Sequence, residues 1–134
     1  MQNQQLTGIK GWLFFYVLLT IFTFFTNTMG IFLETTLIFQ LHIEVNAERI
    51  YDVVSYLILN ILIVISLLAL INKKVYAPSL IITIEVIGII VGIVDFCLSN
   101  RDISEFIDLL IVVILGIVWI LYFKHSKRVK YTYL

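Results

Sequence analysis

The chain has 134 residues, of which 61% are hydrophobic and 13% are charged, and its formal net charge is zero. A soluble domain carries roughly 25% charged residues, and the mean hydropathy here is +1.06. The composition therefore indicates a membrane protein with no room for a separate soluble enzyme beside its spans, and its single cysteine excludes an internal disulfide.

The first apolar run starts at Trp12 and predicts a span over residues 12–32. About 20 helical residues, each rising about 1.5 Å, cross a hydrocarbon core of about 30 Å. Polar residues recur in this span at three- and four-residue steps, which places them on one side of a helix. Because unpaired hydroxyls and amides are costly in lipid, this polar stripe should face other helices. Its members are Thr20, Thr23, Asn27 and Gly30.

Residues 33–49 are predicted to form the longest loop, on the outer side. Apolar residues at every second position from Leu37 to Val45 alternate with Ile38, Gln40, His42 and Glu44, a pattern closer to a strand than to a helix. A lone strand cannot satisfy its backbone groups, so the segment should pair with another segment, pair with a partner, or lie irregularly at the interface. His42 with Glu44 and Glu48 invites a metal interpretation, but no second histidine or thiol completes a site, and we favour a solvated loop.

Three further spans follow in the sequence. Asn46 suits the N-cap of the second helix, and Pro78 suits the first turn of the third, where its missing N–H is not needed. The predicted segments are spans over residues 50–71, 78–98 and 104–123 and a basic tail over residues 124–134.

Once the spans are placed, the charges separate onto two sides of the membrane. Seven bases and no acid fall at one face: Lys10, Lys73, Lys74, Lys124, Lys127, Arg128 and Lys130. Eight acids, with only Arg49 and Arg101 among them, fall at or near the other: Glu34, Glu44, Glu48, Asp52, Asp95, Asp102, Glu105 and Asp108. Short basic flanks are translocated poorly, so the basic face should be cytoplasmic. The predicted fold is an all-α integral membrane bundle of four transmembrane helices with both termini inside.

The third span carries two acids and two glycines within about 80° of arc on one helix face. They are Glu85, Gly88, Gly92 and Asp95. The glycines permit close approach by another helix. That helix could belong to the same bundle or to a second copy of the chain, and both interpretations stay open.

Glu85 lies about 10 Å into the apolar core, and no base lies at its depth. A charge at mid-membrane costs roughly 2.5 to 3.5 kcal/mol, so the carboxyl should be protonated, paired or near water. Asn60, Ser66 and the hydroxyls of the first span are its neutral partner candidates. The candidate intramembrane polar site therefore comprises Glu85, Asp95 and Asn60, either as structural hydrogen bonds or as a path for protons or cations.

Two groups near the helix ends are further candidates for binding. Asp52, Asp95 and Asp108 could gather around a cation, although ordinary interfacial acids are the alternative. At the cytoplasmic interface we expect contacts with lipid or with a partner. The residues expected to make them are Lys127, Arg128, Lys130, Trp12 and Trp119.

The sequence contains no motif that names a reaction. We find no nucleophile paired with a base, no phosphate loop and no paired histidines. Ser126 beside His125 lacks an orienting acid. We therefore predict that the protein is not an enzyme and has no catalytic residues, no metal site, no cofactor and no nucleic-acid partner.

Three segments carry a resemblance to a known family. They are Leu6 to Leu13, ending in Gly-Trp-Leu; Lys73 to Pro78, before the third span; and Tyr122 to Tyr133, with its Ser-Lys-Arg-Val-Lys core. In these segments the chain resembles bacterial membrane proteins grouped as domain-of-unknown-function family 2569. The resemblance implies four spans in a bacterial cytoplasmic (inner) membrane and implies no activity.

Two functions remain open at this stage. The first is a non-enzymatic small membrane protein that binds a membrane-protein partner or itself as a homo-oligomer, in an accessory or immunity role. The alternative is an oligomer that conducts protons or small cations past Glu85.

Overall fold

The computed structural model describes residues 9–40, 46–99 and 101–133 of the chain. It contains the helices α1 (Trp12–Gln40), α2 (Ala47–Ile71), α3 (Ala77–Leu98), α4 (Ile103–His125) and α5 (Lys127–Tyr133). The first four are long and apolar enough to cross a membrane. No strand occurs in the described residues. The predicted all-α class and the four membrane helices are confirmed.

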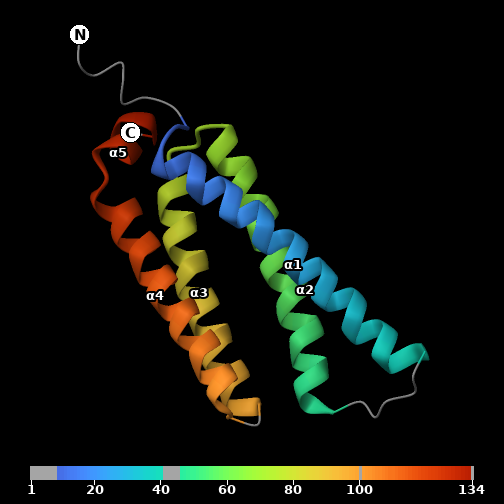
Figure 1. Cartoon of the computed structure of the whole chain (residues 1–134). Coiled ribbons are helices and arrows are strands. Elements are labelled where there is room, and N and C mark those ends of the chain that lie inside the picture. The colour runs from blue at the N-terminus through green and yellow to red at the C-terminus, as the bar shows by residue number, and fades with distance from the viewer. Residues whose placement is uncertain (1–8, 41–45, 100, 134) are drawn as a thin grey trace.

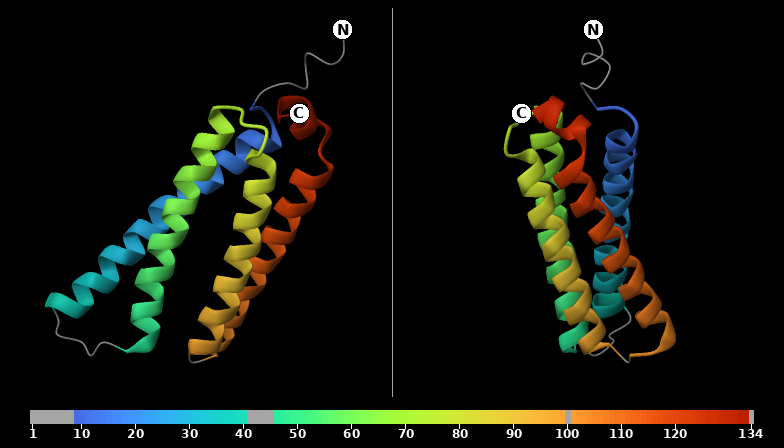
Figure 2. Two further views of the ribbon diagram at one scale, coloured as in Figure 1. Left: turned by 180° about the vertical axis from the view of Figure 1, so that it is seen from behind. Right: turned by 90° about the vertical axis from the view of Figure 1, so that its left-hand side faces the viewer.

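The four long helices form two antiparallel pairs. α1 packs on α2, α3 packs on α4, and α2 and α3 join the two pairs. Figure 1 shows the pairs diverging from the end where α1 starts, and Figure 2 shows the same divergence from behind. The start of α1 and the end of α5 lie at the same end of the bundle (Figure 1).

The charges define the two ends of the bundle. The basic end carries Lys10, Lys73, Lys74, Lys124, Lys127, Arg128 and Lys130. The acidic end carries Glu34, Glu48, Asp52, Asp95, Asp102, Glu105 and Asp108, together with Arg49 and Arg101. Helices that alternate in direction bring these charges together, as the sequence predicts.

Two helices begin with side-chain caps at the acidic end. The predicted N-cap Asn46 accepts a hydrogen bond at Oδ1 from the Arg49 N–H, at 2.9 Å. Asp102 accepts in the same way from the Glu105 N–H, at 3.0 Å. Each cap satisfies one of the N–H groups that a helix start leaves without a partner.

The first helix is longer than predicted. α1 continues to Gln40, so residues 33–40 are helical and the strand-like pattern does not form a strand there; residues 41–45 lie outside the described residues. A helix satisfies its backbone hydrogen-bonding groups within its own segment, whereas a lone strand needs a partner strand to do so. An ion pair between Glu34 and Arg49, at 2.8 Å, also ties the extension to α2. The helices α2, α3 and α4 begin and end within one turn of the residues predicted for the other three spans.

The basic tail is also helical. α4 ends at His125; the next residue, Ser126, has an extended backbone (ψ 122°), and α5 follows at once. The Ser126 hydroxyl accepts from the Val129 N–H at 3.4 Å. Val129 and Tyr133 lie one turn apart on α5 and are both buried. The tail therefore folds back onto the bundle.

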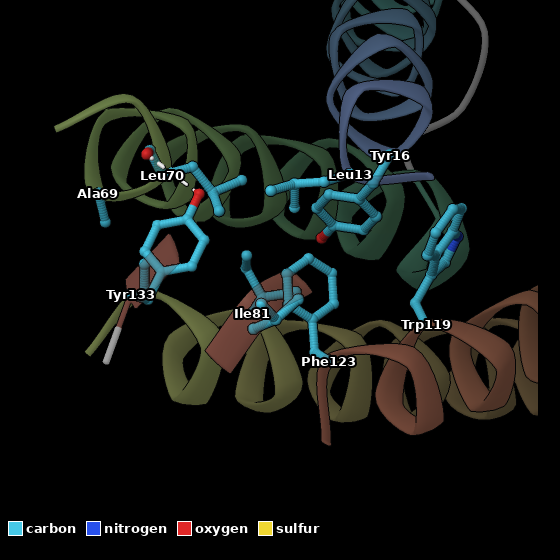
Figure 3. Packing of buried hydrophobic residues seen from close by; sticks show 10 residues of the cluster. Leu13, Tyr16, Ala69, Leu70, Ile81, Trp119, Phe123 and Tyr133 are labelled. Atoms are coloured by element: carbon cyan, nitrogen blue, oxygen red, sulfur yellow. Dashed lines mark hydrogen bonds between the residues drawn. The ribbon is translucent and has the colours of Figure 1, made fainter. Parts of the chain in front are cut away.

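The buried core lies at the basic end. Side chains from all five helices meet there (Figure 3). They are Leu13, Tyr16, Ala69, Leu70, Ala77, Ile81, Trp119, Phe123, Val129 and Tyr133. The Tyr133 hydroxyl donates to the Leu70 carbonyl at 3.2 Å, which also accepts from the Lys73 N–H at 3.1 Å just after the end of α2. Burial raises the pKa of Tyr133 to about 12, which keeps this donor protonated at neutral pH.

Candidate functional site

The membrane-embedded carboxyl of Glu85 has a partner within the same chain. Its Oε1 accepts a hydrogen bond from the Tyr16 hydroxyl at 2.8 Å. Tyr16 is 3% exposed, and its ring lies 4.9 Å from the rings of both Trp119 and Phe123. Figure 3 shows Tyr16 beside Phe123 and Leu13. One side chain thus connects α1 with α3 and α4.

Sequence reasoning missed this partner. Ser66, one candidate, instead donates to the Ile63 carbonyl of its own helix at 2.8 Å. Thr20 likewise donates to the Tyr16 carbonyl at 2.8 Å. The signal that was available is position, because Tyr16 precedes Thr20 by one helical turn and so extends the polar stripe of α1.

Asn60 and Asp95 lie in other contacts. The Asn60 amide donates to the Thr28 hydroxyl at 3.0 Å, which links α2 to α1, and its Oδ1 is buried without a partner. Asp95 lies near the Asp52 carboxyl of α2, toward the acidic end. Glu85 and Asp95 are ten residues apart on α3, which is about 15 Å along its axis. The three predicted residues therefore do not converge on one site.

The two glycines of α3 have different surroundings. A Cβ on Gly92 would lie 3.3 Å from Val112 of α4, whereas a Cβ on Gly88 would meet no atom within 4 Å. Close approach between α3 and α4 depends also on Gly116, where a Cβ would lie 2.9 Å from Ile89. The helix face at Gly88 remains open.

The acidic end is held by polar contacts between helices. Beside the ion pair of Glu34 with Arg49, the Tyr51 hydroxyl donates to the Val91 carbonyl at 2.8 Å. A hollow of about 340 Å³ opens here, lined by Glu34, Asn46, Glu48, Arg49 and Asp52. Within the described residues, no three His, Cys, Asp or Glu side chains are placed to hold a metal ion. The cation cluster considered for Asp52, Asp95 and Asp108 is thus not formed.

Hydrogen bonds lower the pKa of one carboxyl group outside the spans, that of Asp102. The Glu105 N–H and the Ser104 hydroxyl both donate to Asp102 and hold the pKa of its carboxyl below the usual range. A carboxylate that accepts two hydrogen bonds is stabilised in its charged form. Asp102 is therefore a charged cap at the start of α4.

The residues predicted at the basic interface have different exposures. Trp12 is 65% exposed, but Trp119 is only 6% exposed and belongs to the core. Lys127 and Lys130 are exposed. Arg128 is partly buried, and its Nη1 is shielded from solvent without a hydrogen-bond partner.

Four long apolar helices joined by short polar ends define a multi-pass membrane protein. A family model described as "Protein of unknown function (DUF2569)" matches residues 6–134, and the chain belongs to this family. Comparisons with curated proteins and with solved structures give no match.

Proposed function

We propose that this chain is a non-enzymatic membrane protein that binds another membrane protein or a second copy of itself, in an accessory or immunity role. The proposal rests on one observation: in the described part of the chain, the first and fourth helices do not pack along their length, so the four helices do not form a closed ring. α1 and α4 approach each other through the aromatic cluster at the basic end. They do not form an extended packed interface among the described residues.

The open side offers contacts suited to a transmembrane helix. Gly88 leaves the α3 backbone accessible, and small residues let helices in a membrane approach closely. Thr23 and Thr26 of α1 are exposed within the span. A helix that packs at Gly88 would gain close contact with α3. One that packs at Thr23 or Thr26 could donate to their hydroxyls, which already donate to backbone carbonyls of α1.

Affinity purification in mild detergent at native expression tests the proposal. We expect a stoichiometric companion or a homo-oligomer. Gly88→Leu should reduce its recovery at least tenfold if it blocks the contact, whereas Gly88→Ala should have a small effect and serves as the matched control. A clean monomer with no companion would contradict the proposal.

The Tyr16 hydrogen bond supports our proposal that Glu85 has a structural role and that the protein does not conduct ions. A carboxyl that is capped inside one monomer needs no pathway to explain its presence. We therefore expect purified protein in liposomes to dissipate pH and cation gradients no faster than empty liposomes do. Flux that Glu85→Gln abolishes would instead revive the conduction hypothesis.

We further propose that the basic end faces the cytoplasm of a bacterial inner membrane. The support is the charge separation, since Lys and Arg accumulate on cytoplasmic flanks. Reporter fusions after Lys74 and Tyr133 should report an inside location, and fusions near Glu44 and Asp102 an outside one. An outside location at Tyr133 would overturn the orientation.

A further inference from the structure

The basic end contains a guanidinium group, that of Arg128, with no counter-charge in the part of the chain that the structure describes. Arg128 makes no hydrogen bond or ion pair within the described residues, and its Nη1 is shielded from solvent without an acceptor. The described acids lie at the acidic end, except Glu85, which is bonded to Tyr16. Because a partly buried charge without a partner is costly, this group calls for an acceptor from outside the chain.

The docking of α5 holds this arginine in place. Val129, its neighbour in the sequence, is 2% exposed, and Tyr133 is 3% exposed and bonded to the Leu70 carbonyl. Nη1 is the guanidinium nitrogen that is shielded. The Nε and Nη2 donors are not shielded in this way and make no hydrogen bond within the described residues. They lie side by side in one plane, so a ligand that approaches from the surface can accept from both.

A phosphate group matches this geometry and position. α5 follows directly after the end of the α4 span, the level at which a bilayer passes from hydrocarbon to headgroups. Arginine binds phosphate with two parallel hydrogen bonds through its planar fork, whereas lysine acts as a point charge. The depth favours a lipid phosphate over one in free solution.

The surrounding charge favours an anionic lipid. Lys127 and Lys130 are exposed on α5. Lys73 and Lys74 follow the end of α2 that Tyr133 contacts, and the Lys74 N–H bonds the Ala69 carbonyl at 2.9 Å. We propose that Arg128 binds the phosphate of an anionic phospholipid headgroup, and that the neighbouring lysines supply the preference for negative charge. This site goes beyond the proposed function, because it does not depend on any protein partner.

Native mass spectrometry of the full chain in a neutral detergent tests the site. Phosphatidylglycerol, phosphatidylcholine with the same acyl chains, and inorganic phosphate are titrated separately. We expect phosphatidylglycerol to be retained at about tenfold lower concentration than phosphatidylcholine. Arg128→Gln should raise the half-saturating phosphatidylglycerol concentration about tenfold, as expected for loss of a charge-assisted hydrogen-bonded contact.

Two further variants distinguish a specific lipid site at Arg128 from general attraction by the positive charge of the basic end. Lys127→Gln removes the same charge from an exposed position and should change binding about twofold or less, and Arg128→Lys should restore only part of the affinity. Circular dichroism verifies that each variant is folded. Equal losses for Arg128→Gln and Lys127→Gln would overturn the proposal. So would equal retention of the two lipids, or Arg128-dependent binding of inorganic phosphate without a preference for phosphatidylglycerol.

Discussion

The basic end is closed by ten side chains from all five helices, whereas the acidic end is held by polar contacts between neighbouring helices, such as Glu34 with Arg49 and Tyr51 with the Val91 carbonyl. Lipid is as apolar as leucine, so burial alone does not draw helices together in a membrane. Shape and hydrogen bonding must do so. The comparison teaches that hydrogen bonds between helices occur at both ends, whereas the buried side-chain cluster is confined to the basic end, and the helices diverge where that cluster is absent.

Removing the Tyr16 side chain should have the largest effect on the free energy of unfolding, because this side chain joins three helices at the basic end. Tyr16→Ala removes a buried ring packed on Trp119 and Phe123 and the hydrogen bond to Glu85. We expect the free energy of unfolding to fall by about 3 kcal/mol, measured by denaturant titration in mixed micelles. Phe32→Ala is the matched control nearer the acidic end.

Phe32 is 66% exposed, so its loss should change the free energy of unfolding by only about 0.5 kcal/mol. Equal losses for Tyr16→Ala and Phe32→Ala would show that the two ends contribute alike and would refute the comparison.

Two glycine substitutions compare a tightly packed position on α1 with an open position on α3. A Cβ on Gly30 would lie 2.8 Å from Cε2 of the Tyr56 ring, so Gly30→Ala should force α1 and α2 apart and cost about 1 to 2 kcal/mol of unfolding free energy. Gly88→Ala meets no atom and should stabilise α3 by up to about 1 kcal/mol through helix propensity. Thermal denaturation in detergent compares them; the same sign for both would be inconsistent with the packing described.

A smaller effect is expected where α5 closes the basic end. Tyr133→Phe keeps the ring but removes the hydroxyl that bonds the Leu70 carbonyl, at a cost of about 1 kcal/mol. Amide hydrogen exchange in α5 should accelerate about fivefold, since exchange reports local opening. Tyr131→Phe, at a side chain that is 48% exposed, should leave exchange unchanged.

The smallest expected effect is the loss, at acidic pH, of the helix cap that Asp102 provides at the acidic end. Its pKa is lower in the folded protein than the ordinary value, so the cap stabilises α4 fully above the ordinary aspartate pKa of about 3.9 and loses this contribution as the pH falls through the folded value. Amide exchange at the start of α4 should rise over that acidic range. Asp102→Asn, which keeps a capping oxygen, should remove the pH dependence; an unchanged profile would exclude Asp102 as its origin.

Structural features that depend on a single segment could be predicted from the sequence. Hydropathy located the four spans, and residue type identified the Asn46 cap. The charge pattern anticipated which ends of the helices meet, because helices of spanning length must alternate in direction.

Features that depend on two segments were not predictable from the sequence. The bond between Tyr16 and Glu85 requires α1 and α3 to meet at one height, which no local pattern encodes. The alternation from Leu37 onward favoured a strand, but the self-contained hydrogen bonding of a helix decided the outcome through Gln40. α5 has only seven residues, too few for a periodic signal.

The contact of Tyr133 with Leu70 sets an order of events during biosynthesis. Ribosomes make the chain from α1 toward α5, and 63 residues separate the two partners. Each antiparallel pair can therefore enter the bilayer and form its own contacts while the α2 carbonyl still lacks this donor. The closed end is completed only after residue 133 has left the ribosome, so α5 joins the bundle after the other four helices described here.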